Sequence, residues 1–234
     1  MKLSNVRALI TGGSSGIGKE TARQLVKAGA KVVIAARTKE KLHQAADETG
    51  AIPLRCDIGV EREVIDLVEQ TIDRLGSYNV LINNAGYGIF SKLVHLSTPD
   101  FADQLRVNTI GAMMVARESA KYFIRKSYGN IINVSSTAGR KGFDGGTAYA
   151  ASKFALSGMT ECWRTELRSH NIRVMQINPS EVQTEFYRNA GMGDRPYNES
   201  KLMAGDIARL MCDMLSLDDR GFITETSIWA TNPR

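Results

Sequence analysis

The sequence predicts an α/β fold, in which a doubly wound parallel sheet of about seven strands carries helices on both faces. Short segments rich in Val and Ile alternate along the chain with longer amphipathic segments. The short segments are apolar nearly throughout, as expected of strands that are buried on both faces. A glycine-rich turn directly follows the first of them. This alternating order predicts right-handed crossover connections and therefore one parallel sheet.

The individual elements follow from the same alternation. The strand candidates are residues 7–11, 31–36, 51–56, 79–83, 130–135, 173–178 and 222–230. The helix candidates are residues 17–28, 39–49, 61–75, 99–126, 148–170 and 201–215. The stretch 184–200 contains Gly191, Gly193 and Pro196 and is too polar and broken for a core, so we expect a surface loop or short substrate lid there. With 234 residues and no internal repeat or linker, we expect a single domain over residues 1–234.

Composition excludes several function classes. Hydrophobic residues make up 43% and charged residues 24%, a soluble globular profile, and no apolar run approaches the roughly 18 residues of a membrane span. Residues 1–6 run directly into an apolar segment without a signal-peptide layout. Cys56, Cys162 and Cys212 lie far apart, so we expect no metal site, no disulfide framework and a cytoplasmic protein. The net charge of +5 is scattered among acids, and we expect neither nucleic acid nor membrane as a partner.

The glycine-rich turn is Thr11-Gly12-Gly13-Ser14-Ser15-Gly16-Ile17-Gly18. Gly12 permits a tight turn, Gly16 lets a pyrophosphate approach the backbone, and Gly18 allows the following helix to pack closely on the sheet. Free N–H groups at the helix start then face the phosphates. Glycine clusters also occur in ordinary turns, because glycine tolerates positive φ. Its place between a strand and a helix favours a dinucleotide site.

The end of the second strand candidate indicates which dinucleotide is bound. It reads Ile34-Ala35-Ala36-Arg37-Thr38, with Ala36 where an acid normally holds the adenosine ribose of NAD. The guanidinium of Arg37 suits a 2′-phosphate instead. We therefore expect NADP(H) over NAD(H), the alternative being that Arg37 only caps an exposed sheet edge.

The pattern Tyr-x-x-x-Lys places a phenol and an ammonium one helical turn apart, where the positive charge lowers the tyrosine pKa and suits it to acid–base catalysis. It occurs three times, at Tyr122/Lys126, Tyr149/Lys153 and Tyr197/Lys201. The reacting oxygen also needs a hydroxyl donor beside it. Ser136 ends a strand candidate shortly before Tyr149, at the edge where ligands gather in parallel sheets.

The other two tyrosines lack such a donor. Thr109 precedes Tyr122 at the same offset, but both are expected in one long helix, about 20 Å apart. Thr184 precedes Tyr197, yet the glycine- and proline-containing stretch between them guarantees no shared helical face with Lys201. Tyr149 is therefore the candidate acid.

Taken in order, these motifs resemble the short-chain dehydrogenase/reductase family, in its smaller single-domain type. The turn has the spacing G-x-x-x-G-x-G, and the resemblance covers nearly the whole chain. The matching motifs are Asp57, Asn83-Asn84-Ala85-Gly86, Asn108, Ser136, Tyr149-x-x-x-Lys153 and Pro179 through Thr184.

The resemblance implies a catalytic set of Asn108, Ser136, Tyr149 and Lys153. Tyr149 would protonate the substrate oxygen and Ser136 would hold it. Lys153 would lower the tyrosine pKa and contact the nicotinamide ribose, and Asn108 would hold a water linking Lys153 to solvent. The alternative for Asn108 is a polar residue that bends its helix. Ser135 and Asn83 are read as structural.

The resemblance also implies the residues that contact the cofactor. Asp57 would accept from the adenine amino group, or instead cap the next helix. The turn from Pro179 to Thr184 would hold the carboxamide, although Ser180 replaces the usual glycine and would be strained at positive φ. The full set is Gly12, Ser14, Ser15, Gly16, Ile17, Gly18, Arg37, Asp57, Ile58, Asn84, Ala85, Gly86, Tyr149, Lys153, Pro179, Val182 and Thr184.

The expected substrate is a small carbonyl compound or alcohol. Aromatic residues near the expected pocket indicate a partly apolar site, the alternative being loop packing; they are Tyr87, Phe90, Phe143, Phe186 and Tyr187. The chain resembles 3-oxoacyl-carrier-protein reductases in its core motifs, but residues 224–233 lack their glycine pair, so an acyl thioester is an alternative.

Two further alternatives concern the function class. A non-catalytic NADP(H)-binding sensor would not need Ser136, Tyr149 and Lys153. A nucleotide-sugar epimerase would need a substrate region for which this chain has no room. The helices 99–126 and 148–170 have apolar positions on more than one face, and the resemblance implies that they pair into a homodimer or homotetramer.

Overall fold

The computed structural model describes residues 1–193 and 196–232, and its centre is a sheet of seven strands in the order β3-β2-β1-β4-β5-β6-β9. All neighbouring strands in this sheet are parallel. The strands are β1 (Arg7–Thr11), β2 (Lys31–Ala36), β3 (Ile52–Arg55), β4 (Val80–Asn83), β5 (Gly129–Val134), β6 (Ile172–Pro179) and β9 (Glu225–Ile228). The predicted doubly wound parallel sheet is confirmed.

The strand order reverses at the centre of the sheet. From β1 the chain proceeds outward to β2 and β3, and then returns to pair β4 with the other side of β1. In sheets of this kind the loops that leave β1 and β4 diverge, which opens a crevice at the carboxyl ends of the strands.

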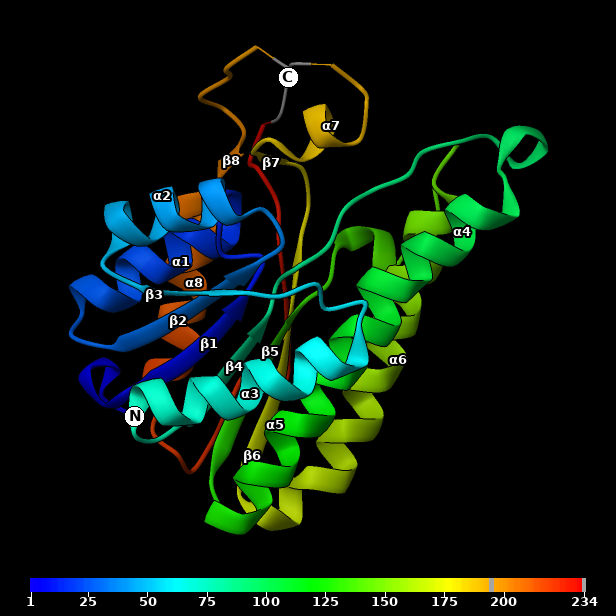
Figure 1. Cartoon of the computed structure of the whole chain (residues 1–234). Helices are drawn as coiled ribbons and strands as arrows, with labels where there is room; N and C mark the ends of the chain where they lie inside the picture. Colours follow the sequence, from blue (N-terminus) through cyan, green and yellow to red (C-terminus); the bar gives the residue numbers. More distant parts are fainter. Residues whose placement is uncertain (194–195, 233–234) are drawn as a thin grey trace.

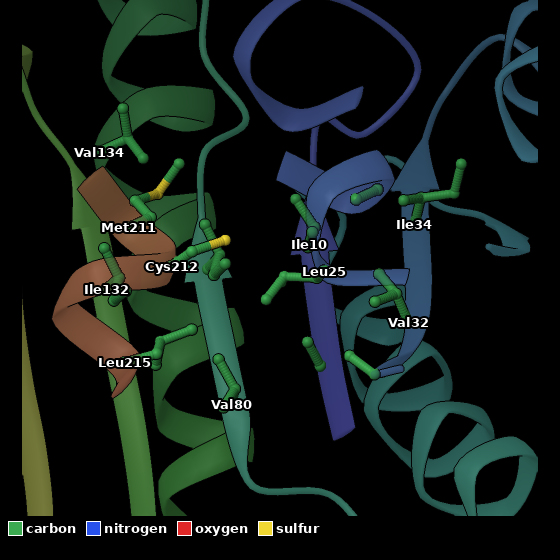
Figure 2. Packing of buried hydrophobic residues seen from close by; sticks show 14 of the residues in the cluster. Ile10, Leu25, Val32, Ile34, Val80, Ile132, Val134, Met211, Cys212 and Leu215 are labelled. Atoms are coloured by element: carbon green, nitrogen blue, oxygen red, sulfur yellow. The ribbon is translucent and has the colours of Figure 1, made fainter. Parts of the chain in front are cut away.

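Helices cover both faces of the sheet (Figure 1). One layer contains α1 (Gly16–Lys27), α2 (Lys39–Thr49) and α8 (Ala204–Ser216), and the other contains α3 (Glu61–Leu75), α5 (Ala112–Lys126) and α6 (Thr147–Leu167). Within β1, Ile10 faces the first layer and Leu9 the second, and both side chains are fully buried. Figure 2 shows Met211, Cys212 and Leu215 of α8 over the sheet. Burial on both faces explains why the strands are apolar throughout.

The predicted helix 99–126 is interrupted. The structure has α4 (Thr98–Leu105), a π-helical turn η3 (Arg106–Gly111) and then α5. Wider turns of this kind are rare and are frequently found at functional sites. Here the Asn108 amide donates to the Tyr87 carbonyl at 2.9 Å and accepts from its N–H at 3.1 Å, so the wide turn directs Asn108 at the segment after β4.

The predicted loop 184–200 has some regular structure. At its base β7 (Val182–Gln183) pairs with β8 (Leu202–Met203), and the loop carries the short helix α7 (Phe186–Asn189). These pieces lie beyond the carboxyl ends of the strands (Figure 1). The helix predicted from residue 201 therefore begins at Ala204. Residues 194–195 of this loop lie outside the described residues, as do 233–234 at the C-terminus.

The remaining elements are single 3-10 turns, namely η1 (Leu3–Asn5), η2 (Leu93–His95), η4 (Thr137–Gly139) and η5 (Arg168–His170). The last of these accounts for the final residues of the predicted helix 148–170. A search of the described residues finds no helix long and apolar enough to cross a membrane.

Candidate active site

A cleft of about 1320 Å³ runs along the carboxyl ends of the strands. It exceeds the roughly 300–1,000 Å³ of most small-molecule pockets, so a large ligand fits. Gly18 and Asn108 lie behind its wall. The other residues that the sequence nominates line it: Gly12, Ser14, Ser15, Gly16, Ile17, Arg37, Asp57, Ile58, Asn84, Ala85, Gly86, Ser136, Tyr149, Lys153, Pro179, Val182 and Thr184.

The glycine turn is locked to the end of β4. The Asn84 amide donates to the carbonyls of Thr11 at 3.0 Å and Gly12 at 3.1 Å. Gly12 has φ of +67°, and a Cβ there would lie 2.8 Å from Cα of Ala85. Only glycine combines this conformation with this close approach.

Gly18 lies at a close approach between α1 and the glycine turn. A Cβ at Gly18 would lie 2.5 Å from both the Asn84 amide nitrogen and the Gly12 carbonyl oxygen. The absence of a side chain therefore lets the start of α1 lie close to the end of β1 and leaves room for the Asn84 amide.

The cation expected to bind a 2′-phosphate lies at one end of the cleft. Arg37 is exposed, lines the cleft and has no ion-pair partner among the residues that the structure describes. The Asp57 carboxylate accepts from the Gly59 N–H at 2.8 Å, while α3 begins only at Glu61 after Val60. Asp57 therefore does not cap α3, and its side chain lines the cleft beside Ile58.

Ser136 and Tyr149 meet at the other end of the cleft. Ser136 follows β5 and caps η4 by accepting from the Ala138 N–H at 3.1 Å, and Tyr149 lies in the first turn of α6. Both side chains line the cleft, and the hydrogen-bonding influence of the Ser136 hydroxyl acts to lower the pKa of the Tyr149 phenol. Lys153, one turn further along α6, is buried; its Nζ donates to the Val134 carbonyl at 2.9 Å and lies 5.8 Å from the centre of the Tyr149 ring.

The pKa values of this group differ from the expectation. Burial raises the pKa of Tyr149 to about 12, although its hydrogen bond with Ser136 acts to lower it. Burial lowers the pKa of Lys153 to about 8. The expected lowering of the tyrosine pKa by the ammonium is therefore not found, because desolvation of the phenol is the larger effect.

The two other Tyr-x-x-x-Lys pairs lie elsewhere. Tyr122 packs in the core with Tyr78 and Phe123, with Lys126 Nζ 5.6 Å from its ring centre. The Tyr197 side chain is 78% exposed, and Lys201 pairs with Glu181 at 2.9 Å. Within the described chain, the cleft is lined by neither Tyr122 nor Tyr197.

Asn108 links the segment after β4 to α6. Its amide donates to the Ser152 hydroxyl at 3.1 Å as well as to the Tyr87 carbonyl, and its oxygen is the closest neighbour of a Cβ built on Gly86, at 3.2 Å. The same Cβ would lie 3.6 Å from Lys153 Nζ. Asn108 and Lys153 thus both lie next to the backbone of Gly86.

Ser180 carries none of the strain considered above. The positive-φ residues other than glycine in the described chain are Ser127 and Asn171, so Ser180 is not left-handed. Its N–H donates to the Ile228 carbonyl at 2.9 Å, which continues the β6–β9 pairing. The next turn brings the Thr184 methyl group to 3.2 Å from a Cβ built on Gly16.

Four aromatic rings surround the Tyr149 phenol. Phe90 lies 5.6 Å and Phe186 5.5 Å from its ring centre, and Phe90 also contacts Phe143 at 5.9 Å and Tyr187 at 6.4 Å. All four line the cleft. Tyr87 lines it too, but its hydroxyl donates to Asp103. The substrate end of the cleft is therefore largely apolar.

Two polar contacts that support the site were missed at the level of sequence. Buried Gln104 in α4 donates to the Tyr87 carbonyl and accepts from the Ile89 N–H, each at 2.6 Å. Glu225 in β9 pairs with Arg140, at the end of the turn that begins at Ser136. A buried amide among apolar helix positions is a usable signal for Gln104, whereas the Glu225 contact depends on strand order alone.

The residues present fit a dinucleotide cofactor. The Arg37 guanidinium, which has no ion-pair partner among the described residues, the backbone without side chains at Gly12 and Gly86, and the volume of the cleft all suit a large anionic ligand. The structure holds no group of three or more His, Cys, Asp or Glu side chains placed to bind a metal ion, among the described residues.

Known proteins resemble this chain in sequence and in architecture. A family model described as short chain dehydrogenase matches residues 6–194. The NADP-dependent 3-hydroxy acid dehydrogenase of Schizosaccharomyces pombe is 31% identical over 99% of this chain and 95% of its own length. The 3-oxoacyl-(acyl-carrier-protein) reductase of Thermotoga maritima is 36% identical over 79% of this chain and 77% of its own. A metagenomic short-chain oxidoreductase solved with NADP superposes with a TM-score of 0.84 and 30% identity, covering 98% of this chain and 99% of that one.

Proposed function

The chain belongs to the short chain dehydrogenase family, and from that premise we propose that it is an NADP(H)-dependent oxidoreductase that interconverts a carbonyl compound and an alcohol. The observation that carries this proposal is that Ser136 and Tyr149 line the same cleft, where the hydrogen-bonding influence of the Ser136 hydroxyl acts to lower the pKa of the phenol. A phenol and a second hydroxyl group at one point provide a proton donor and a holder for the same substrate oxygen.

In carbonyl reduction, Tyr149 donates its proton to the substrate oxygen while Ser136 holds that oxygen by a hydrogen bond. Reduced nicotinamide, when bound, supplies the hydride that the carbonyl carbon accepts. A phenol whose pKa is about 12 stays protonated at neutral pH and is ready to donate. In the reverse direction Tyr149 takes the proton of the alcohol.

Lys153 and Asn108 would support the proton transfer by Tyr149. With its pKa near 8, Lys153 exists in both protonation states around neutral pH, which suits a group that returns a proton to Tyr149. Asn108 connects this region to Tyr87 and Ser152 and would position the water that supplies the proton.

The other cleft residues would hold the cofactor. The backbone of Ser14 through Ile17, ahead of Gly18, would face the pyrophosphate, Arg37 would bind the 2′-phosphate, and Asp57 with Ile58 would contact the adenine. Ala85 and Gly86 would lie along the ribose, and Pro179, Val182 and Thr184 would hold the carboxamide. Support comes from the cleft that these residues line and from the unpaired Arg37.

A 3-oxoacyl thioester is a second candidate substrate, favoured by the likeness to the Thermotoga maritima reductase. The relative from Schizosaccharomyces pombe adds small 3-oxo and 3-hydroxy acids to the compounds worth testing. The apolar rings around Tyr149 favour uncharged ketones and aldehydes.

The test is NADPH oxidation with ketones, aldehydes, 3-oxo acids and acetoacetyl thioesters. Tyr149→Phe should lower kcat at least about 100-fold while the NADPH dissociation constant changes less than about twofold. Tyr122→Phe is the matched control, because that tyrosine belongs to the same motif but lies in the core. Tight NADPH binding without turnover of any compound would replace this proposal with a non-catalytic sensor.

A further inference from the structure

Helix α2 and the lid helix α7 are tied together across the mouth of the cleft. Lys41 Nζ lies 3.3 Å from Glu185 Oε2. Both residues line the main cleft, and both also line a second cavity of about 250 Å³ beside Ser14, Ser15 and Gly16. The ion pair therefore lies next to the turn assigned to the cofactor phosphates.

Lys41 differs from the other cations around this second cavity. Lys19 pairs with Glu48 at 2.6 Å, and Arg23 pairs with Glu20 and Glu48, so these cations are held by acids of α1 and α2. The carboxylate that pairs with Lys41 comes from the far side of the cleft, at the start of the lid helix. Opening the lid or inserting a ligand therefore affects Lys41 alone among the three.

Breaking the Lys41–Glu185 ion pair costs little free energy. The side chains of Lys41 and Glu185 are 56% and 40% exposed, and ion pairs with this exposure contribute about 0–1 kcal/mol. Glu185 also accepts from Arg188 at 2.9 Å, so its carboxylate keeps a partner when Lys41 leaves. Burial would raise the pKa of Glu185, but the hydrogen bonds from Lys41 and Arg188 outweigh it and keep the carboxylate ionised.

Lys41 lines the same cleft as Arg37, the unpaired cation proposed to bind the 2′-phosphate. A phosphate monoester has a charge between −1 and −2 at neutral pH and offers three acceptor oxygens, more than one guanidinium satisfies. It attracts an ammonium more strongly than a single carboxylate does.

We propose that Lys41 is a second ligand of the cofactor 2′-phosphate, and that Glu185 forms an ion pair with the Lys41 ammonium until that phosphate binds. This inference rests on the proposed NADP(H) function. Binding of NADP(H) would break the Lys41–Glu185 ion pair that connects α2 to the lid. NAD(H), which lacks the phosphate, would leave this ion pair intact. Glu185 therefore weakens the binding of NADP(H), and Lys41 strengthens it.

The experiment measures nucleotide binding without chemistry. Dissociation constants of 2′,5′-ADP and 5′-ADP are determined calorimetrically for wild type, Lys41→Gln, Glu185→Gln and the double variant. Lys39→Gln and Glu40→Gln serve as controls, because these exposed residues of α2 line neither cavity. Both controls should bind as wild type does.

Glu185→Gln should bind 2′,5′-ADP about three- to tenfold more tightly and 5′-ADP unchanged, and Lys41→Gln should bind 2′,5′-ADP about five- to twentyfold more weakly. In the double variant the gain from Glu185→Gln should disappear, because no ammonium remains to be released. Equal effects on both nucleotides, or a gain that persists without Lys41, overturns this inference alone. Wild type that binds both nucleotides equally overturns the NADP(H) preference and this inference together.

Discussion

The Tyr149 phenol at the start of α6 lines the same cleft as the Ser136 hydroxyl that follows β5, and Ser136 acts to lower the pKa of that phenol. Two opposing effects act on the pKa of Tyr149. Burial among Phe90 and Phe186 raises the tyrosine pKa, and the hydrogen bond with Ser136 partly offsets the rise. Each effect comes from a different part of the fold, so each can be changed separately.

Ser136→Ala removes the hydroxyl that would hold the substrate oxygen, and it should lower kcat about 100-fold while raising the tyrosine pKa further. The adjacent Ser135 is the matched control, because its buried hydroxyl contacts the Lys153 carbonyl and the Ser157 hydroxyl, each at 3.3 Å. Ser135→Ala should cost about 1 kcal/mol of stability and leave kcat within a few-fold of wild type. Equal losses of kcat in both variants would remove the special role of Ser136.

Lys153 should make stability depend on pH. Its pKa in the folded protein, about 8, lies below the ordinary value of 10.5, so between these values the unfolded chain binds more protons and stability rises with pH. Between pH 7 and 9.5 wild type should gain about 2 kcal/mol relative to Lys153→Met. Urea unfolding of both proteins at the two pH values measures this. The lost hydrogen bond to Val134 is the same at both, so it cancels in the comparison. A difference that does not change with pH would show that Lys153 stays charged on folding.

Arg37→Ala should weaken NADPH binding about 10- to 100-fold and change NADH binding less than about twofold. The reason is that the guanidinium, which has no ion-pair partner among the described residues, is available to a phosphate. Fluorescence titration with both nucleotides measures the preference. Arg62→Ala is the control, since Arg62 pairs with Asp66 on the surface of α3. An unchanged preference would assign cofactor selection to other residues.

Gly18→Ala should destabilise the fold by about 1–3 kcal/mol and weaken NADPH binding, because the new methyl group would displace the Asn84 amide from the turn. Gly205→Ala in α8 meets only the Gln24 amide nitrogen, at an ordinary contact distance of 3.8 Å, and should stabilise the protein by up to about 1 kcal/mol. Thermal unfolding of the two variants should therefore shift in opposite directions. A stabilised Gly18→Ala protein with normal cofactor binding would contradict the assigned role of Gly18.

We propose that the surface formed by η3, α5 and α6 pairs two copies of this chain. Ile110 and Phe154 are each 47% exposed there, and Ile124 is 37% exposed. Phe154→Glu should convert a dimer or tetramer into the 25.7 kDa monomer in sedimentation, since an unpaired charge would be buried at the interface. Val94→Glu, at an 82% exposed position on η2, should leave the assembly unchanged. Wild type that sediments as a monomer would refute the proposal.

Much of the fold and most members of the site could be predicted from the sequence. Buried parallel strands are apolar throughout, and this local signal located all seven, with β9 (Glu225–Ile228) shorter than expected. The glycine turn and the Ser136–Tyr149 spacing are local too, and the structure brings these segments to one cleft. The π-helical turn at Arg106–Gly111 was not predicted; its Asn108 contacts Tyr87, which lies in another segment, and helical periodicity carries no signal for such a contact.

The chain's order of apolar and glycine-rich segments by itself determined the sheet, the cleft and the identity of the residues around it, since those signals reside in short stretches of sequence. Only the tertiary structure decided the protonation behaviour of Tyr149 and Lys153 and the pairing of Lys41 with Glu185. Desolvation and charge pairing depend on which distant side chains exclude water from a group or approach it. The spacing of residues along the chain does not indicate which distant side chains become these neighbours.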